Sequence, residues 1–428
     1  MRFLLGARAV GDNLPALRYY LQSPTIPHSV TRRRSLRKSV AVHPDQDSIW
    51  LTTLNDAERR NVRQVSQAAL LPSPDLLVLG GGIVGLATAY FAAERGLRVQ
   101  VVSESTELAR DAEWSLGGII PNVCRWQFSP ATQQLGQASR DWWAKLAVRP
   151  EFQIDWRVCG ALMVDEQRLA PDPRQHMLAA LDEGYSVHDV DAEQVALLEP
   201  ALSPRRLGGL HYPSEALLHP LKAASGFITG LTRRGGQIAA VDSISSVKVE
   251  SGRVTSVETS SGTIRAKTIF CDDPQFLARL AGDQLVLPEF EQTRQSFLAT
   301  AATTPLLKRQ VLDTHWVVQL KSGEMVIAFP STDNESKVTE RAVEQTRQLI
   351  PALRDVPFNR AWTGMSQRSA NGIPVIDQVA QCENVWYSGG LDFAQLLFAP
   401  IIGKSLVDWT KDNQQPEDLV PFSARMVT

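Results

Sequence analysis

From Asp75 to the C-terminus, the chain alternates between two hydrophobic periods. Short apolar runs typical of β-strands are separated by longer stretches in which apolar residues recur at helical spacing. The pattern predicts strands over Leu76 to Leu79, Arg98 to Val102, Gln237 to Glu250, Arg253 to Thr259, Thr263 to Phe270, Trp316 to Leu320 and Met325 to Phe329. It predicts helices over Leu86 to Arg95 and over residues 131–147, 176–184, 221–234, 340–350 and 398–411. Alternation of this kind indicates an α/β core.

Two local motifs follow from the spacing of these strands. The runs between Gln237 and Phe270 favour a β-meander closed by a return strand. The last two strands are joined by only four residues, Lys321 to Glu324, which include Gly323 and predict a hairpin.

Residues 1–73 differ in character from the rest of the chain. The first forty contain seven Arg and one Lys against a single acidic residue, Asp12. This Arg-rich, acid-poor composition is typical of an organelle presequence, and a basic arm lying on a partner subunit explains it equally well. A helix is predicted from Asn55 to Leu70, leading into the turn Pro72-Ser73-Pro74.

A glycine motif follows the first predicted strand of the core. Gly80, Gly82 and Gly85 form G-x-G-x-x-G at the start of a helix. Gly80 permits a tight turn, Gly82 lets the backbone approach a pyrophosphate, and Gly85 lets the helix pack on the strand, while the helix N-terminus stabilises phosphate charge. The glycines also argue against a transmembrane reading of the uncharged stretch Leu76 to Ala93. The complete strand-turn-helix-strand unit predicts a dinucleotide site.

An acidic residue is expected at the end of the second strand, where it binds the adenosine ribose. Counting from Gly96, the expected position is Ser103, and the carboxylate comes one residue later as Glu104. A small bulge would bring Glu104 into place, or Ser103 would make a weaker hydrogen bond. A solvated Glu104 at the strand end is the alternative.

Charge and cysteine content narrow the function classes. The formal net charge is only -2, so the chain lacks the global basic field that nucleic acid binding requires. The cysteines Cys124, Cys159, Cys271 and Cys382 are widely spread, without a CxxC pair or a His/Cys cluster at metal-ligand spacing. We therefore expect no metal site and no nucleic acid partner, and we interpret the cysteines as thiols in a reducing compartment.

Several segments between Asp75 and Phe422 resemble the D-amino-acid oxidase superfamily, which includes glycine and sarcosine oxidases. Besides the glycine motif, they are Ser115-Leu116-Gly117-Gly118-Ile119-Ile120-Pro121, Trp156 to Leu162, Glu215 to Pro220, Gly372 to Asp377, Asn384 to Gly390, Ala399-Pro400 with Gly403, and Pro421-Phe422-Ser423. In that family the first of these segments runs beneath a flavin, and the strand ending near Gly390 precedes a helix whose N-terminus faces the flavin.

The resemblance implies an α/β fold with a Rossmann-type FAD-binding domain and an α+β substrate domain built on a mixed sheet. The expected parts are a basic N-terminal extension over 1–73, an FAD-binding domain over 74–128, 205–285 and 359–428, and a substrate domain over 129–204 and 286–358. It implies FAD as the cofactor and a small amine or amino acid as the substrate. The implied reaction transfers hydride from the amine-bearing carbon to flavin N5.

Besides Ser103, three positions depart from the family pattern. Asp273 stands where the family has a glycine close to the cofactor, and its carboxylate would repel a pyrophosphate unless it turned outward or met a cation. Ser366 stands where relatives hold the substrate carboxylate with an Arg. Arg368 lies two residues further and would point to the same face as Ser366 if the segment is an extended strand. It is a candidate anchor for the substrate carboxylate, and a surface Arg at the strand end is the alternative. Gln395 replaces a glycine before the last helix, where it hydrogen-bonds the flavin edge or blocks it.

The candidate site residues follow from these matches. His315 and Trp316 fall where relatives often place an aromatic that faces the substrate, with core packing as the alternative. The candidate catalytic residues are Arg368, His315 and Trp316. The candidate cofactor-binding residues are Gly80, Gly82, Ile83, Val84, Gly85, Ser103, Glu104, Ser115, Gly117, Gly118, Val247, Gly390 and Gln395.

Two functions fit the sequence. The first, which we favour, is an FAD-dependent oxidoreductase that acts on an amine or amino acid. The second is a family member that has lost catalysis and serves as a structural or regulatory subunit, with the basic arm bound to a protein partner. The expected location is the cytoplasm, or an organelle matrix if the basic segment is a presequence.

Overall fold

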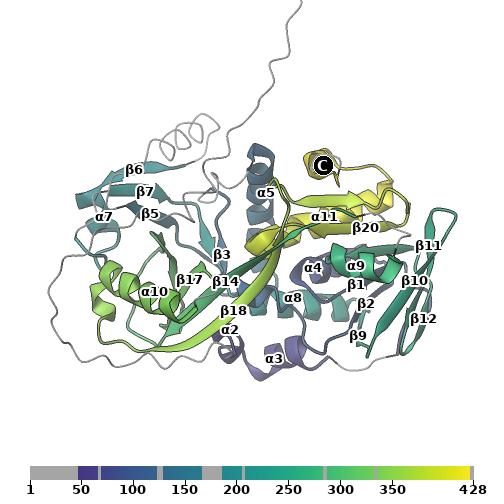
Figure 1. The fold of residues 1–428 in the computed structure, drawn as a ribbon, viewed down its shortest axis with the longest axis horizontal. Coiled ribbons are helices and arrows are strands. Elements are labelled where there is room, and N and C mark those ends of the chain that lie inside the picture. The colour runs from purple at the N-terminus through teal and green to yellow at the C-terminus, as the bar shows by residue number, and fades with distance from the viewer. Residues whose placement is uncertain are drawn as a thin grey trace, which may run out of the picture. The chain divides into compact units, whose positions relative to one another are not determined.

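A computed structural model of the chain describes residues 47–65, 69–122, 129–165, 186–204, 208–282, 287–331 and 335–424, all within one compact unit, Val40–Thr428. Figure 1 labels its helices and strands. The helix predicted over 176–184 and residues 1–46 of the N-terminal extension lie outside the described residues.

A six-stranded sheet carries the dinucleotide motif. Its order is β19-β20-β13-β1-β2-β9, and every pair is parallel except β19 with β20. The strands are β1 (Leu76–Leu79), β2 (Val99–Ser103), β9 (Gln237–Ala240), β13 (Thr268–Cys271), β19 (Val375–Gln378) and β20 (Val385–Gly389). Because parallel strands point their carboxyl ends to one edge, the segments that follow β1, β2, β13 and β20 meet there.

An eight-stranded mixed sheet forms the second large layer, in the order β18-β14-β17-β16-β15-β5-β7-β6 (Figure 1). Only β15 and β5 pair in parallel. The strands are β5 (Ala161–Asp165), β6 (His188–Asp191), β7 (Gly208–Tyr212), β14 (Glu291–Thr300), β15 (Gln310–Leu312), β16 (Trp316–Gln319), β17 (Met325–Pro330) and β18 (Phe358–Arg368). The predicted hairpin over 316–329 is confirmed as β16 and β17.

Two three-stranded sheets complete the strand set. One contains β10 (Ile244–Glu250), β11 (Arg253–Thr259) and β12 (Gly262–Ile264), which is the predicted meander. The other joins β3 (Gly118–Ile119) and β4 (Arg157–Val158) to the central β8 (Ala216–Leu217). The segment that was expected beneath a flavin therefore pairs with the segment that begins at Glu215.

Helices cover the six-stranded sheet and close its core. They are α4 (Ile83–Glu94), α5 (Pro130–Ala147), α8 (Pro220–Arg233), α9 (Pro274–Ala281) and α11 (Gln395–Asp412), with α7 (Ala192–Leu198) and α10 (Glu335–Leu349) beside the other sheet. The N-terminal segment forms α2 (Ile49–Thr52) and α3 (Asp56–Arg63), and short 3-10 turns cover Ala112–Trp114, Pro351–Leu353, Asp392–Ala394 and Glu417–Phe422. The helices predicted in the core are confirmed, with ends shifted by a few residues.

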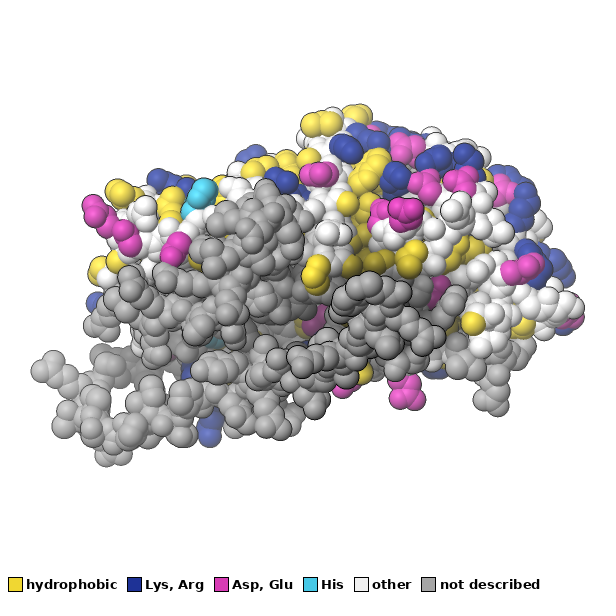
Figure 2. Space-filling model, turned by 90° about the horizontal axis from the view of Figure 1, so that it is seen from above, with side chains coloured by type: hydrophobic (Ala, Val, Ile, Leu, Met, Phe, Trp, Pro, Cys, Tyr) yellow, Lys and Arg dark blue, Asp and Glu magenta, His cyan; other side chains and the backbone are white. Residues whose placement is uncertain are grey.

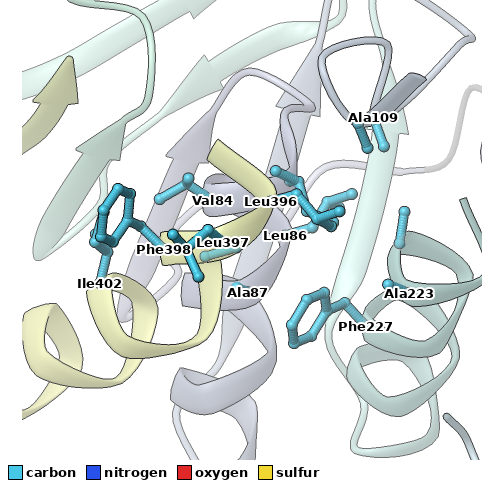
Figure 3. Packing of buried hydrophobic residues seen from close by; sticks show 14 of the residues in the cluster. Val84, Leu86, Ala87, Ala109, Ala223, Phe227, Leu396, Leu397, Phe398 and Ile402 are labelled. Atoms are coloured by element: carbon cyan, nitrogen blue, oxygen red, sulfur yellow. The ribbon is translucent and has the colours of Figure 1, made fainter. Parts of the chain in front are cut away.

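Helix α4 is buried on nearly its whole circumference, as expected for a helix with apolar residues all round. Figure 3 shows side chains of α11, among them Phe398 and Ile402, on one side of α4 and Phe227 of α8 on the other. Gly403 allows α11 to approach closely, because a Cβ there would lie 2.7 Å from the Thr88 amide nitrogen. The packing fixes the start of α4 relative to the strand ends.

Some predicted boundaries were wrong. The run from Gln237 to Glu250 is two strands, because the chain leaves the six-stranded sheet after Ala240 and enters the meander at Ile244. The run from Thr263 to Phe270 divides in the same way into β12 and β13. The helix predicted over Asn55 to Leu70 ends as α3 at Arg63, where Gln64 adopts a non-helical backbone.

Two strands that fall within the expected FAD-binding domain belong to the eight-stranded sheet instead. The segments 205–285 and 359–428 were assigned to the FAD-binding domain, yet β7 and β18 are strands of the eight-stranded sheet. In particular, β18 pairs with β14 along nearly its whole length, so backbone hydrogen bonds hold it to the substrate side. The division of function between two domains remains a proposal.

The described surface carries mixed charge. Figure 2 shows Lys and Arg side chains interspersed with Asp and Glu over the described part of one face, so neither sign gathers into one large patch there. In the part of the chain that the structure describes, no helix combines the length and apolar character needed to cross a lipid bilayer.

Candidate functional site

A cavity of about 480 Å³ opens at the carboxyl-terminal edge of the six-stranded sheet. Its walls come from the segments that follow β1, β2, β13 and β20 and from the C-terminal end of β18. They include Gly80, Gly82, Val84, Ser103, Glu104, Asp111, Trp114, Asp272, Asp273, Arg279, Met365, Ser366, Gln367, Gly390 and Gln395. Seven of the predicted cofactor-binding residues, Gly80, Gly82, Val84, Ser103, Glu104, Gly390 and Gln395, thus line one cavity.

The glycine motif forms a turn that leads into the N-terminus of α4. Gly80 has φ +110°, a conformation that favours glycine, and Gly82 caps the helix without a side-chain hydrogen bond. The first amides of α4 therefore point toward the cavity edge, where a helix N-terminus attracts an anion. The backbone matches the predicted dinucleotide cradle.

The side chain of Asp272 lies against this cradle. Its Oδ2 accepts a hydrogen bond from the Gly85 amide at 3.0 Å. A Cβ built on Gly80 would lie 2.6 Å from Asp272 Oδ1, and one built on Gly82 would lie 2.5 Å from Oδ2. The space that the motif glycines leave open therefore holds a carboxylate from the end of β13.

A second carboxylate, Asp111, lies at the same helix end. The Ile83 amide donates to its Oδ1 at 3.1 Å and to its Oδ2 at 3.0 Å. Burial, together with the nearby charge of Asp111, raises the pKa of Asp272 to about 7. Burial likewise raises the pKa of Asp111 to about 6, against the lowering effect of the Ile83 hydrogen bond. The α4 N-terminus thus faces two carboxyl groups that titrate near neutral pH.

These carboxylates decide how well the site fits FAD. The glycine turn and the helix N-terminus are the backbone features that hold the diphosphate of a dinucleotide. The amides of Ile83 and Gly85, however, already donate to Asp111 and Asp272, and two ionised carboxylates would repel a diphosphate. In the arrangement described, the cradle does not fit the diphosphate of the cofactor.

Asp273 differs from its expected role. Its side chain caps α9 by accepting from the Phe276 amide at 3.1 Å, and Gln367 Nε2 lies 3.5 Å from its Oδ1. It lines the cavity, but the carboxylate that contacts the glycines belongs to Asp272, one residue earlier. Sequence reasoning missed both Asp272 and Asp111. The sequence signal that could have identified Asp272 is its position directly after the buried strand β13, which pairs with β1.

At the ribose position, Ser103 is the last residue of β2 and its Oγ accepts from the Ser105 amide at 3.1 Å. Glu104 also lines the cavity, and its Oε1 accepts from the Ile244 amide at 2.8 Å. The β10 backbone therefore holds the Glu104 carboxylate at the cavity wall. Its predicted contact with a ribose stays a proposal.

The far end of the cavity is lined by neutral polar and apolar side chains. Ser366 Oγ donates to the Asp392 carbonyl oxygen at 2.5 Å, and Gln395 Nε2 donates to Ser366 Oγ at 2.9 Å. Trp114 packs on β18, where a Cβ on Gly364 would lie 2.4 Å from its ring. Ser366 and Gln395, two of the departures from the family pattern, thus bond to each other.

The other predicted residues lie away from the cavity lining. Arg368 Nη2 donates to Glu291 Oε2 at 3.2 Å, in a partly exposed ion pair. His315 packs edge-on against Phe329, with ring centroids 5.7 Å apart. Val247 is buried in the core formed with β10. Their assignments to catalysis and cofactor binding remain proposals without a contact to this cavity.

Segment Ser115 to Gly118 is tightly constrained. Gly117 has φ +75°, and a Cβ there would lie 2.1 Å from the Leu218 carbonyl oxygen, so only glycine fits. Ser115 Oγ accepts from the Gly117 amide at 3.0 Å. A Cβ on Gly118 would lie 2.5 Å from the Trp316 ring, which places Trp316 directly against this segment.

Residues of the N-terminal segment contact the chain at Glu113 and Ser115. Trp50 Nε1 donates to the Ser115 carbonyl oxygen at 2.9 Å. Ser48 Oγ donates to Glu113 Oε2 at 2.5 Å, and Arg63 forms a largely buried ion pair with the same carboxylate. Part of the predicted N-terminal extension therefore belongs to the folded unit. The proposed basic arm concerns residues outside the described ranges.

Over the described ranges, no group of three or more His, Cys, Asp or Glu side chains is arranged to hold a metal ion.

Comparison with known proteins places the chain among flavoproteins. Residues 75–409 match the family model described as FAD dependent oxidoreductase. The chain is 25% identical over 367 residues to glycine oxidase of Pseudomonas aeruginosa, covering 82% of this chain and 98% of the relative. It is 23% identical over 386 residues to mitochondrial dimethylglycine dehydrogenase of Rattus norvegicus, covering 81% of this chain and 44% of the relative.

A solved structure shares the fold. The crystal structure of glycine oxidase from Geobacillus kaustophilus matches with a TM-score of 0.74 and 18% sequence identity, over 84% of this chain and 99% of that one. The predicted α/β architecture, with a Rossmann-like FAD-binding part and a mixed-sheet substrate part, is confirmed. Because the family model spans most of the chain, the protein belongs to the D-amino-acid oxidase family of FAD-dependent oxidoreductases, and membership assigns FAD as its cofactor.

Proposed function

We propose that the protein oxidises a small amine or amino acid, and that amines without a carboxylate are its better substrates. The observation that carries this proposal is the cavity whose lining includes both the glycine cradle and Ser366 with Gln395. Bound FAD would supply the acceptor for hydride leaving the amine-bearing carbon.

The chain's own residues would bind and orient the substrate at the Ser366 end. The Ser366 hydroxyl and the Gln395 amide offer neutral hydrogen-bonding groups. Trp114 and Met365 add apolar surface to the same walls. An acid-base side chain is not required for hydride removal, so a neutral site is compatible with this chemistry.

Charge in the cavity favours an amine over a carboxylate. Arg110 and Arg279 are the cationic side chains among its described lining residues, and Arg110 is paired with Glu107 at 2.8 Å. Arg368, the candidate anchor, is paired with Glu291. Because Arg110 and Arg368 are paired with carboxylates, neither offers a substrate the bidentate guanidinium contact that planar carboxylates prefer, and the Arg279 guanidinium lies over the Phe276 ring at 5.3 Å.

The names of the relatives support the substrate class. Glycine oxidase and dimethylglycine dehydrogenase are both named for small molecules that contain an amine nitrogen. Their identities to this chain are low enough for the preferred substrate to differ.

Anaerobic mixing of the FAD-loaded protein with substrates of both kinds tests the proposal. We expect loss of the oxidised flavin absorbance with primary or secondary amines, and slower loss with glycine or sarcosine. Reduction by glycine alone would overturn the preference, and no reduction by any amine or amino acid would overturn the function.

The role of Arg368 has its own test. If it anchors a carboxylate, Arg368→Ala should raise the KM for a carboxylate substrate much more than the KM for a neutral amine. Equal effects on both would remove Arg368 from the site, as its ion pair with Glu291 leads us to expect.

A second candidate function is a family member without catalysis, acting as a structural or regulatory subunit. The two carboxylates in the glycine cradle favour it, because they occupy the donors a diphosphate needs. The visible spectrum of the purified protein distinguishes the candidates. Released flavin after denaturation supports the oxidoreductase, whereas a colourless protein that cannot be reconstituted supports the subunit.

A further inference from the structure

The glycine cradle contains an internal competitor for the cofactor. The Gly85 amide donates to Asp272, and the Ile83 amide donates to both oxygens of Asp111. These amides are the donors that a helix N-terminus offers to an anionic ligand. A carboxylate and a phosphate oxygen have similar acceptor geometry, so they compete for the same positions.

The competition is steric as well as electrostatic. The contacts of Asp272 with Gly80 and Gly82 place its two oxygens on the surface that those glycines leave free for a close approach. A diphosphate could not occupy that surface while the Asp272 side chain remains there. Asp111 adds a second negative charge against the Ile83 amide of the same turn.

Asp272 lies between β13 and α9, and displacement of its side chain gives up the hydrogen bond from the Gly85 amide. The neighbouring Asp273 caps α9 with its own side chain, so the start of that helix does not depend on Asp272. Displacement therefore leaves both flanking elements in place.

We propose that Asp272, with Asp111, acts as a built-in substitute for the cofactor diphosphate and sets the affinity of this chain for FAD. The inference rests on the proposed function only in that FAD is the ligand. FAD binds when the two carboxyl groups turn away from the cradle or become protonated. Affinity should therefore rise as the pH falls.

Other charges face the same space. Glu104, Glu107 and Asp273 line the cavity with Asp272 and Asp111, against the cations Arg110 and Arg279. Glu104 and Asp273 each accept a backbone hydrogen bond elsewhere, and Glu107 is paired with Arg110. Burial places the pKa of Asp272 at about 7 and that of Asp111 at about 6, so these two change charge between pH 5.5 and 8.

The test measures FAD binding to the full chain by quenching of flavin fluorescence and by calorimetry, at pH 5.5 and pH 8. At pH 8, Asp272→Asn should tighten the Kd at least tenfold, because removal of one charge near a diphosphate relieves strong repulsion. Asp272→Ala also vacates the space and should tighten it further. The double variant Asp272→Ala with Asp111→Ala should bind most tightly and show little dependence on pH.

The matched control is Asp273→Asn. It removes the same charge one residue along, in the same cavity, and Asn caps a helix as well as Asp does. We expect a change of less than about threefold in Kd, since the Asp273 carboxylate accepts from the Phe276 amide and is not among the nearest neighbours of an added Cβ at Gly80, Gly82 or Gly85. Urea unfolding of each variant confirms that it is folded.

Each outcome decides the inference. It is supported if the Asp272 and Asp111 variants bind FAD more tightly than the wild type at pH 8 and the wild type gains affinity at pH 5.5. It is overturned if the double variant matches the wild type within threefold, including the case in which neither binds, or if Asp273→Asn has an equal effect. Substrate oxidation is not part of this readout. An FAD-loaded double variant that no amine reduces would therefore count against the proposed function alone.

Discussion

The two ends of the cavity differ in how they depart from a flavin site. At the α4 end the backbone follows the dinucleotide pattern, and the change is two added carboxylates, Asp272 and Asp111. At the β18 end the charged anchor is missing, and Ser366 and Gln395 satisfy each other through a hydrogen bond. The first change alters the charge offered to the cofactor, whereas the second alters what the substrate meets.

The comparison teaches that a glycine motif specifies a shape and not its occupant. The turn at Gly80, the N-terminus of α4 and the packing of α11 and α8 would be the same with or without a bound diphosphate. The anionic groups at that helix end are the carboxylates of Asp272, which follows β13, and of Asp111, in the segment after β2. Variants at the two ends should therefore differ in their free energy of unfolding and in how that free energy depends on pH.

The largest expected effect is at the glycine turn. Gly80→Ala should lower the free energy of unfolding by about 3 kcal/mol, because φ +110° strains a non-glycine residue and the new Cβ would meet Asp272 Oδ1. Urea denaturation measures the loss. Gly235→Ala is the matched control, since Gly235 also has positive φ but no atom within 4 Å of an added Cβ. Equal losses at the two glycines would mean that Asp272 does not lie against the turn.

The next effect is a pH dependence of stability at Asp272. Its pKa in the folded protein, about 7, lies above the ordinary value of 3.8, so its contribution to stability is fully present below about pH 4 and is lost as the pH rises through 7. Asp272→Asn keeps an acceptor for Gly85 and cannot ionise. The variant should exceed the wild type by about 2 kcal/mol in unfolding free energy at pH 8, and by much less at pH 4.5. A difference that is the same at both pH values would contradict the assignment.

The smallest effect is expected at the neutral end. Ser366→Ala removes the bonds that link Ser366 to Gln395 and to the Asp392 carbonyl oxygen, and should cost about 1 kcal/mol. Because Ser366 and Gln395 do not titrate, this loss should be similar at pH 5.5 and pH 8. Ser245→Ala, which removes an exposed hydroxyl bond, serves as the control and should cost less. A loss at Ser366 that changes strongly with pH would show that the two ends are coupled.

Much of the fold follows from local pattern. The strand β1, the turn and the helix α4 were predictable because the hydrophobic run, the glycine spacing and the Ala-rich helix all favour one structure. The boundaries within Gln237 to Glu250 were not, because a continuous β-type pattern does not show where a chain passes from one sheet to another. The sheet to which a strand belongs depends on partners that are distant in the sequence. For this reason β18, which pairs with β14, belongs to the eight-stranded sheet.

The candidate site was predictable in its backbone and less so in its side chains. Gly80, Gly82 and Gly390 were named from the sequence, and all three line the cavity, Gly80 and Gly390 with positive φ and Gly82 where an added Cβ would meet Asp272. Arg368 was considered as an anchor from strand alternation, but an ion pair with Glu291 on the neighbouring strand holds it outside the cavity lining. Alternation gives the face of a strand and does not give the partner on the next one.

The sequence by itself determined the α/β class, the glycine turn and the family resemblance, because each depends on residues close together in the chain. Only the tertiary structure decided which carboxylates reach that turn. Asp272 lies 187 positions after Gly85, and Asp111 lies 28 after Ile83, yet the parallel pairing of β1 with β13 and the path of the chain after β2 bring both to one helix end. A site assembled from the ends of several strands is a property of the sheet, so its charge follows from strand order and not from any one segment.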